Sequence, residues 1–344
     1  MNTSESFLND QRLTADIDAD QLVERYFSAH KQGEIYQALG MELEQLKGLA
    51  VDNDVLRFLN NVKPRPSWYS AKQILRGQQV FEFYATDIMR LLGVLSLPYC
   101  YAGSPGNKAL YHSEKMRNRP AKRLTDTAEF VLGVSTPGTL NASGIGYLQI
   151  NRTRLIHAIA RYYLLKGSDW NMSWGMPINQ EDMAGTNLAF SYIILNGLRR
   201  SGINLSERQK EDFGYLWRYI GYQLGINEDL LPTTYREAFE LNKILKKRNF
   251  RYSEEGVVLT TELLNYYRSV APDGQSRFVN AQVRYFLGSR VSGYLGLDPE
   301  PLNDRITGLA NSFQEIGNYV RIYKKSYGEM MRNYRSFNSG KQKV

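Results

Sequence analysis

The residue best suited to chemistry is a histidine near the middle of a predicted helix. His157 lies within the helical pattern 149–166, and the small Ala160 one turn later leaves room beside the imidazole for a flat ligand. Arg154 and Arg161, a turn before and a turn after, can reach carboxylates at the rim of such a ligand and disfavour protonation of the ring. A neutral imidazole among apolar side chains and cations is typical of a b-type haem site. The pattern also fits a hydrogen-bonded core histidine, so both interpretations stay open.

A second group of polar residues lies earlier in the chain. Arg123 and Thr127 are four positions apart, so they share one face of the helix predicted over 123–134. That face continues into apolar residues, which makes the guanidinium and the hydroxyl a candidate polar corner of a pocket. The alternative is a boundary salt bridge beside a threonine that bonds back to its own helix.

A third feature is the segment 174–186, which leads from a loop into a helix. Pro177 favours an extended entry, and Asn179 is a candidate N-cap. Glu181 and Asp182 then lie near the positive end of the helix. A purely structural loop-to-helix transition explains these residues as well as a functional one.

All three groups of residues lie on predicted helices. Alternating strand patterns are scarce, whereas helical periodicity runs through most of the chain. Apolar spacing predicts helices over 20–30, 34–49, 71–95, 123–134, 149–166, 179–200, 213–224, 234–247, 259–270, 278–295 and 302–333. We therefore predict an all-α fold with a single large helical domain. Its predicted parts are an N-terminal helical segment (1–60), a central domain (61–300) and a C-terminal helix with a basic tail (301–344).

The composition excludes several classes of site. The single cysteine, Cys100, excludes a disulfide framework and any zinc or iron–sulfur site built on several thiolates. The whole chain has three histidines, which argues against a multi-histidine metal site. It contains no Walker A loop, no His-Glu-x-x-His motif and no Gly-x-Ser-x-Gly elbow.

Charge and hydropathy limit the partners. The chain has 43 basic and 35 acidic residues, a formal charge of +8, and part of the excess lies in the tail 321–343. No nucleic-acid motif accompanies this charge, so we expect no nucleic-acid partner; a tail held at an anionic membrane surface is a further hypothesis. No leader pattern precedes the first helix, and no apolar run approaches the roughly 20 residues that cross a bilayer. We expect no stable membrane insertion and a cytoplasmic location.

Taken in order, these features resemble the MpaB-type and rubber oxygenases, a family that includes the latex clearing proteins. The histidine motif followed by the Pro-Ile-x-Gln-Glu-Asp segment is more specific than either part alone, and the similarity extends over about residues 60–300. The matching stretches are Arg123-x-x-x-Thr127, Arg154-Leu-Ile-His157-Ala-x-x-Arg161, Gly175-x-Pro177-Ile-x-Gln180-Glu181-Asp182 with Thr186, and Trp217-Arg218-Tyr219-x-Gly221-x-x-Leu224-Gly225.

The resemblance implies an all-helical fold with a globin-like core that binds haem b. Carried over by position, His157 is the proximal iron ligand, and Arg123 and Thr127 are pocket residues needed for haem binding or activity. The implied reaction is O2-dependent cleavage of an isoprenoid C=C bond to carbonyl products. In such proteins the haem supplies the oxygen chemistry, while the protein sets axial ligation, pocket polarity and access.

Two positions depart from the family pattern. Rubber-cleaving members carry a lysine just before the pocket threonine, whereas this chain has Asp126, so closure of the distal iron site by lysine is not expected. A proton-carrying role for that carboxylate is a further hypothesis. The family's catalytic glutamate has no secure counterpart, because unshifted spacing leads to Asn107 and Glu114 matches only with a shift. Proton abstraction from an allylic carbon therefore lacks an assigned base.

We therefore expect an enzyme, a haem-b-dependent oxygenase that acts with O2 on a small hydrophobic substrate such as an isoprenoid. His157 is expected to bind the iron, Arg123 to hold a propionate or polarise bound oxygen, and Thr127 to donate a hydrogen bond nearby. The cofactor-binding set also includes Arg154 and Arg161. The alternative, motivated by Asp126 and the missing glutamate, is a non-catalytic helical protein that binds haem or lipid.

Overall fold

The computed structural model describes residues 1–40, 53–113, 120–141, 144–167, 170–271 and 276–301. Within these ranges the regular structure is helical, apart from one isolated antiparallel bridge between Gly103 and Phe250. The predicted all-α class is thus confirmed. The elements are α1 (Glu5–Leu13), α2 (Ile17–Ser28), α3 (Gln32–Gly40), α5 (Asp54–Asn60), α6 (Ala71–Leu91), η1 (Leu92–Ser96), α7 (Leu97–Tyr101), α8 (Ser104–His112), α10 (Pro120–Ser135), α11 (Ile145–Gly167), η2 (Met172–Trp174), α12 (Gln180–Phe190), α13 (Tyr192–Arg200), α14 (Glu207–Gln223), η3 (Glu228–Leu230), α15 (Tyr235–Asn249), α16 (Glu254–Val270), η4 (Ser276–Phe278), α17 (Val279–Leu287) and α18 (Ser289–Tyr294).

Two helices that the sequence predicts as continuous are divided. The helix predicted over 179–200 breaks at Ser191, whose φ of −112° and ψ of −83° lie outside the helical region, and becomes α12 and α13. The helix predicted over 278–295 becomes α17 and α18, because Gly288 adopts a φ of +79° that only glycine reaches without strain. Both predictions of an unbroken helix are therefore wrong.

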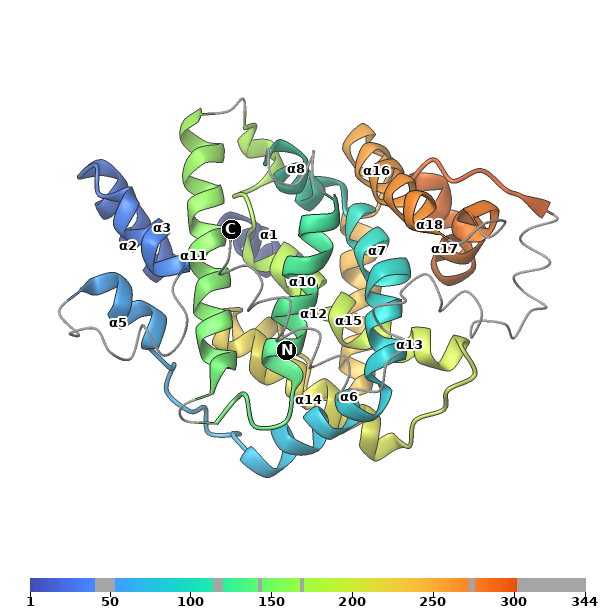
Figure 1. Ribbon diagram of the computed structural model, residues 1–344, viewed down its shortest axis with the longest axis horizontal. Helices are drawn as coiled ribbons and strands as arrows, with labels where there is room; N and C mark the ends of the chain where they lie inside the picture. Colours follow the sequence, from blue (N-terminus) through green and yellow to red (C-terminus); the bar gives the residue numbers. More distant parts are fainter. Residues whose placement is uncertain (41–52, 114–119, 142–143, 168–169, 272–275, 302–344) are drawn as a thin grey trace.

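The N-terminal helices lie against the outer side of α11. In Figure 1, α2, α3 and α5 are on one side of α11, and the rest of the bundle is on the other. Leu22, Phe27 and Ile35 form an apolar cluster there with Leu155 and Ala158 of α11. This second cluster attaches the N-terminal segment to the main core and leaves α11 covered on two sides.

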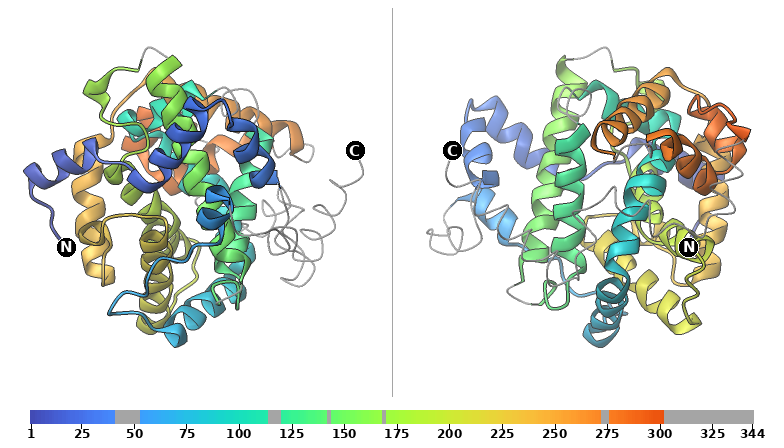
Figure 2. Two further views of the ribbon diagram at one scale, coloured as in Figure 1. Left: turned by 90° about the vertical axis from the view of Figure 1, so that its left-hand side faces the viewer. Right: turned by 45° about the vertical axis from the view of Figure 1, so that its right-hand side comes forward.

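The main core is organised around α6, which is kinked at Tyr84 (φ −106°, ψ 18°) and packs on α14. α6 continues through the π-helical turn η1 into α7, as the two views of Figure 2 show. Gly77 of α6 lies so close to α14 that a Cβ at this position would be 2.7 Å from the Cβ of Leu216. Beside it, Arg76 Nε donates to Asp212 Oδ2 at 2.7 Å. This close approach fixes α6 against α14, and α7, which follows α6 and η1, carries the buried Tyr101.

Several expectations concern residues outside the described ranges. Residues 302–344, with the predicted helix 302–333 and the basic tail, lie there, as does the second half of the helix predicted over 34–49. The membrane-surface hypothesis and the domain limits therefore stay predictions. In the part of the chain that the structure describes, no helix is both long and apolar enough to cross a membrane.

Candidate functional site

Helices α10 and α11 form an antiparallel pair that carries all the residues predicted for the site (Figure 1). The two helices are in close contact at Gly133, where a Cβ would lie 2.8 Å from Cγ of Gln149. Both helices rise by the same distance per residue, about 1.5 Å. His157 lies eight residues after Gln149 on α11, and Thr125 lies eight residues before Gly133 on α10. The turn from Arg123 to Thr127 is therefore at about the same height along the pair as His157. The hairpin thus brings the two predicted groups to one level of the bundle.

His157 is half-buried and has one buried ring nitrogen. This atom, Nδ1, makes no hydrogen bond with any of the described residues. Burial, together with the nearby positive charge of Arg161, lowers the pKa of the imidazole to about 4. The ring is therefore neutral at pH 7 and keeps a lone pair, the form in which histidine binds a metal ion. A core histidine that has its hydrogen bonds satisfied would look different, so this environment favours a ligand role.

Arg123 is a buried cation on the facing helix. Its Nε has no hydrogen-bonding partner, and its guanidinium forms no ion pair with any described residue. The guanidinium lies over the ring of Tyr101, 4.6 Å from the centroid. Burial lowers the pKa of Arg123 to about 10 despite Tyr267, Glu262 and Cys100, which act in the opposite direction. Burial of an unpaired charge is costly, so this position is suited to an incoming anionic group such as a carboxylate.

Thr127 is half-buried with a free hydroxyl, whereas Asp126 is exposed and already paired. Thr125 bonds back to the carbonyl of Ala121 at 3.1 Å, whereas the half-buried Thr127 hydroxyl makes no hydrogen bond with the described residues. The Asp126 carboxylate is 52% exposed and pairs with Lys122 at 2.9 Å. Thr127 is therefore able to donate to a ligand. Asp126 is engaged at the surface, and we assign it no part in proton transfer.

Arg154 and Arg161 are bound to protein carboxylates. Nε of Arg154 lies 2.7 Å from Oδ2 of Asp16, and Nε of Arg161 lies 2.7 Å from Oδ1 of Asp20. Both carboxylates come from the start of α2, on the outer side of α11. Their buried guanidiniums thus hold the N-terminal helices, and the expectation that they also reach the rim of a cofactor stays a prediction.

The segment 174–186 joins three helices. Asn179 caps α12 as predicted, since its side chain accepts a hydrogen bond from the backbone of Asp182 at 2.9 Å. Glu181 is fully buried and lies 3.3 Å from Arg12 Nε and 3.0 Å from Arg248 Nε. The acidic pair therefore ties α1 and α15 to the start of α12. Its two arginines are far away in the sequence, where no local pattern marks them.

The two sequence positions nearest to the family glutamate offer no described carboxylate. Asn107 is buried, and its Nδ2 donates to the carbonyl of Tyr101 at 2.7 Å and to Ser253 Oγ at 2.8 Å. Glu114 lies outside the described residues. The described part of the chain also holds no group of three or more His, Cys, Asp or Glu that would bind a bare metal ion. A haem iron needs only one axial side chain, which His157 fits.

Comparison with known proteins agrees with the all-α fold. Residues 85–320 match the family described as ER-bound oxygenase mpaB/B'/Rubber oxygenase, catalytic domain. The match covers more than half of the chain, so the chain belongs to this family of catalytic domains.

Two relatives define the similarity more closely. A rubber oxygenase from Streptomyces sp. (strain K30) is 23% identical over 263 residues, which are 75% of this chain and 64% of the relative. The chain thus spans just under two thirds of that relative's length. The solved structure of latex clearing protein LCP in the closed state has a TM-score of 0.75, with 20% identity, over 94% of this chain and 90% of that one. At this identity the likeness shows a shared fold.

Proposed function

We propose that the chain is a haem-b-dependent oxygenase that acts with O2 on a hydrophobic substrate of the isoprenoid class. The observation that carries the proposal is His157, whose buried Nδ1 is unpartnered among the described residues on a ring with a pKa of about 4. Membership of the oxygenase family and the similarity to a rubber oxygenase support the type of reaction and the type of substrate.

The residues of the hairpin suit a haem with distinct roles. His157 would be the protein ligand of the iron, because its neutral ring keeps a free lone pair. Arg123 would bind a propionate, since a buried guanidinium gains most from a charge-assisted, bidentate partner. Thr127 would donate a hydrogen bond beside it. When bound, the haem supplies the oxygen chemistry.

Tyr101 has a positioning role that the sequence did not reveal. Its ring is fully buried and lies under the guanidinium of Arg123, 4.6 Å away at the centroid. Stacking of this kind restrains a guanidinium in one plane. The Tyr101 ring would therefore hold the guanidinium of Arg123 in the orientation that binds the propionate. It also keeps water away from the face of the guanidinium that lies against the ring.

Haem titration tests the ligand assignment. We expect the full chain, reconstituted with haemin, to show a Soret band and about one haem b per chain in a pyridine haemochrome assay. His157→Ala should lose stoichiometric haem while its far-UV circular dichroism stays helical. The matched control is His112→Ala, which removes an exposed histidine of α8. Full haem occupancy in His157→Ala would rule out His157 as the ligand.

A non-catalytic protein that binds haem or lipid is the second candidate. The observation that favours it is Asn107, which occupies the unshifted glutamate position and is held by Tyr101 and Ser253. Oxygen uptake separates the two candidates. Consumption of O2 that depends on added isoprenoid oligomers, and that disappears in Arg123→Ala, supports the oxygenase. Full haem occupancy without such consumption supports the binding protein.

A further inference from the structure

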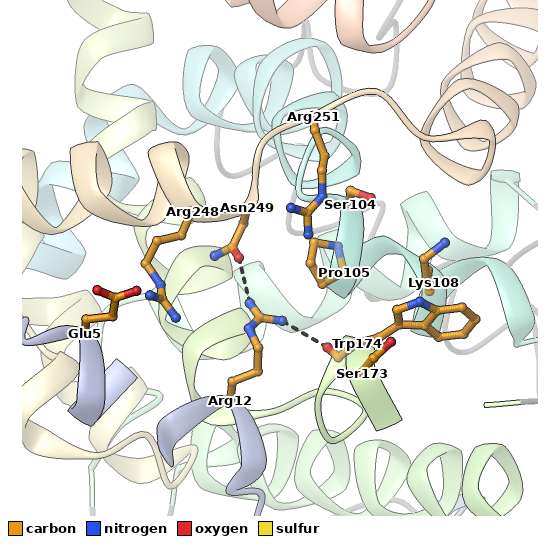
Figure 3. A pocket seen from close by; sticks show the side chains of 10 residues that line it. All are labelled: Glu5, Arg12, Ser104, Pro105, Lys108, Ser173, Trp174, Arg248, Asn249 and Arg251. Atoms are coloured by element: carbon orange, nitrogen blue, oxygen red, sulfur yellow. Dashed lines mark hydrogen bonds between the residues drawn. The ribbon is translucent and has the colours of Figure 1, made fainter. Parts of the chain in front are cut away.

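A second site lies outside the hairpin, where α1, α8, η2 and the end of α15 meet. Figure 3 shows a pocket there of about 440 Å³, within the range of about 300–1,000 Å³ that is usual for small-molecule sites. Four cations line it, Arg12, Lys108, Arg248 and Arg251, and the lining has one carboxylate, Glu5. None of these residues belongs to the candidate haem site.

Three of the four cations are neutralised within the protein. Arg248 binds the buried carboxylate of Glu181 at 3.0 Å, and Arg12 lies 3.3 Å from Glu181 and 3.1 Å from Asp182, so two carboxylates balance these two arginines. Lys108 has an ion-pair partner of its own. The exposed guanidinium of Arg251 forms no ion pair and no side-chain hydrogen bond with any described residue. Arg251 is thus the lining cation whose charge is available to a ligand.

A buried hydroxyl and a helix N-terminus lie at the same end of the pocket. Ser104 lines the pocket and is only 6% exposed, yet its hydroxyl makes no hydrogen bond with the described residues. It is the first residue of α8, a helix of nine residues whose N-cap, Gly103, supplies no side-chain bond. Figure 3 shows Arg251 beside Ser104 and Pro105. The guanidinium, the hydroxyl and the start of α8 therefore lie at one end of the pocket. In the first turn the N–H groups of Ser104 and Gly106 are the ones available, because Pro105 has none and Asn107 N donates to the carbonyl of Gly103 at 2.9 Å.

We infer that this end of the pocket binds the phosphate group of a small organic molecule. A helix N-terminus favours a phosphate, and the guanidinium fork matches two of its oxygens. The pocket is less suited to an aromatic ligand, because its Trp174 ring is already engaged. The ring stacks on His112 at an interplanar angle of 18°, and the ammonium of Lys108 lies 4.6 Å from its centroid. The pocket is larger than a phosphate ion and leaves space for the organic part.

The acidic residue of the lining lies apart from the proposed phosphate position. Figure 3 shows Glu5 at the other end of the pocket, beside Arg248 and away from Ser104. Its carboxylate repels an anion across the pocket. A second carboxylate, that of Asp182, lies against Gly106 in the first turn of α8 and is bound by Arg12 and Asn179. Removal of the Glu5 charge should therefore strengthen phosphate binding, whereas removal of Arg251 should weaken it.

Calorimetric titration of the full chain with inorganic phosphate and pyrophosphate tests the site. We expect saturable binding that weakens about tenfold or more in Arg251→Gln, because a charge-assisted hydrogen bond is lost. Ser104→Ala should weaken it several-fold, and Glu5→Gln should strengthen it. Arg236→Gln is the matched control, since it removes an exposed arginine at the other end of α15 and should leave the affinity unchanged.

Three results would overturn the inference. The first is the absence of saturable binding, and the second is binding that is the same in the wild type and Arg251→Gln. The third is a protein that ignores free phosphate but floats with phosphatidic acid vesicles through Arg251, which would make the ligand a lipid headgroup. Thermal unfolding curves of each variant, compared with the wild type, separate a loss of binding from a loss of folding. Because the two sites share no residue, the outcome is independent of haem binding.

Discussion

Arg154 donates two hydrogen bonds to Asp16, from Nε to Oδ2 at 2.7 Å and from Nη2 to Oδ1 at 2.9 Å. The two side chains are only 4% and 7% exposed. Asp16 also caps α2 by accepting a hydrogen bond from Ala19 N. One carboxylate therefore starts a helix, neutralises a buried guanidinium and attaches the N-terminal segment to the helix that carries His157.

This pair makes the first prediction. Asp16→Asn should destabilise the fold by about 3 kcal/mol, because the charge of Arg154 stays buried without its partner. The control is Asp18→Asn, whose carboxylate lies 3.7 Å from Arg154 but is 80% exposed, and whose loss should cost less than about 1 kcal/mol. Urea denaturation followed by circular dichroism measures both. Equal losses in the two variants would contradict the role of the buried pair.

The second prediction concerns the pH dependence of the haem-free protein. His157 has a pKa of about 4 when folded and about 6.5 when unfolded, so between these values only the unfolded chain binds the proton. Stability is therefore lost as the pH falls from about 6.5 toward 4, by about 2 kcal/mol at pH 5. Urea denaturation at pH 7 and pH 5 should show this loss in the wild type and a smaller one in His157→Gln. An identical loss in both proteins would refute it.

The third prediction follows from the charge of Arg123, which is unpaired among the described residues. Arg123→Met keeps an apolar side chain of similar length, and it should stabilise the haem-free protein by about 1–2 kcal/mol while it weakens haem binding. Lys122→Met, at an exposed position of the same helix, should change neither property by much. Chemical denaturation and haem titration give the two measurements. A destabilised Arg123→Met protein would show that the guanidinium already has a structural partner.

The fourth prediction tests the contact of α6 with α14. Gly77→Ala should destabilise by at least about 2 kcal/mol, since the new Cβ would lie 2.7 Å from the Cβ of Leu216 and the helices would have to separate. Gly214→Ala on α14 is the control, because no described atom lies within 4 Å of the place its methyl group would take and alanine is the better helix former, by about 1 kcal/mol. Thermal unfolding should move in opposite directions in the two variants.

Features that depend on a few neighbouring residues were predictable. The N-cap at Asn179 forms as the sequence predicts, because it is closed between residues three positions apart. The two divided helices show the limit of such reasoning. The break at Ser191 and the left-handed Gly288 are single-residue departures within patterns whose apolar spacing continues unchanged.

The partners of the charged residues were not predictable. In the sequence, Arg154 and Arg161 lie one turn from His157, where a cofactor and a carboxylate of the protein are equally good partners for them. Asp16, the partner of Arg154, is 138 positions away, and Arg12 reaches Asp182 across 170 positions. Such pairs form only when packing brings distant helices together, and apolar spacing does not encode which charges will then meet.

Periodicity, capping and short motifs are local, so the amino-acid sequence was enough to predict the helical class, most of the helix positions and the family resemblance. It also singled out His157, Arg123 and Thr127 as candidates for the site. The packing of the helices decided which of the candidate groups are left without partners. Burial in the hairpin leaves His157 and Arg123 unpaired among the described residues, turns Asp126 to the surface and pairs Arg154 with Asp16. Desolvation and ion pairing depend on distances in space, and these distances are set when the core folds.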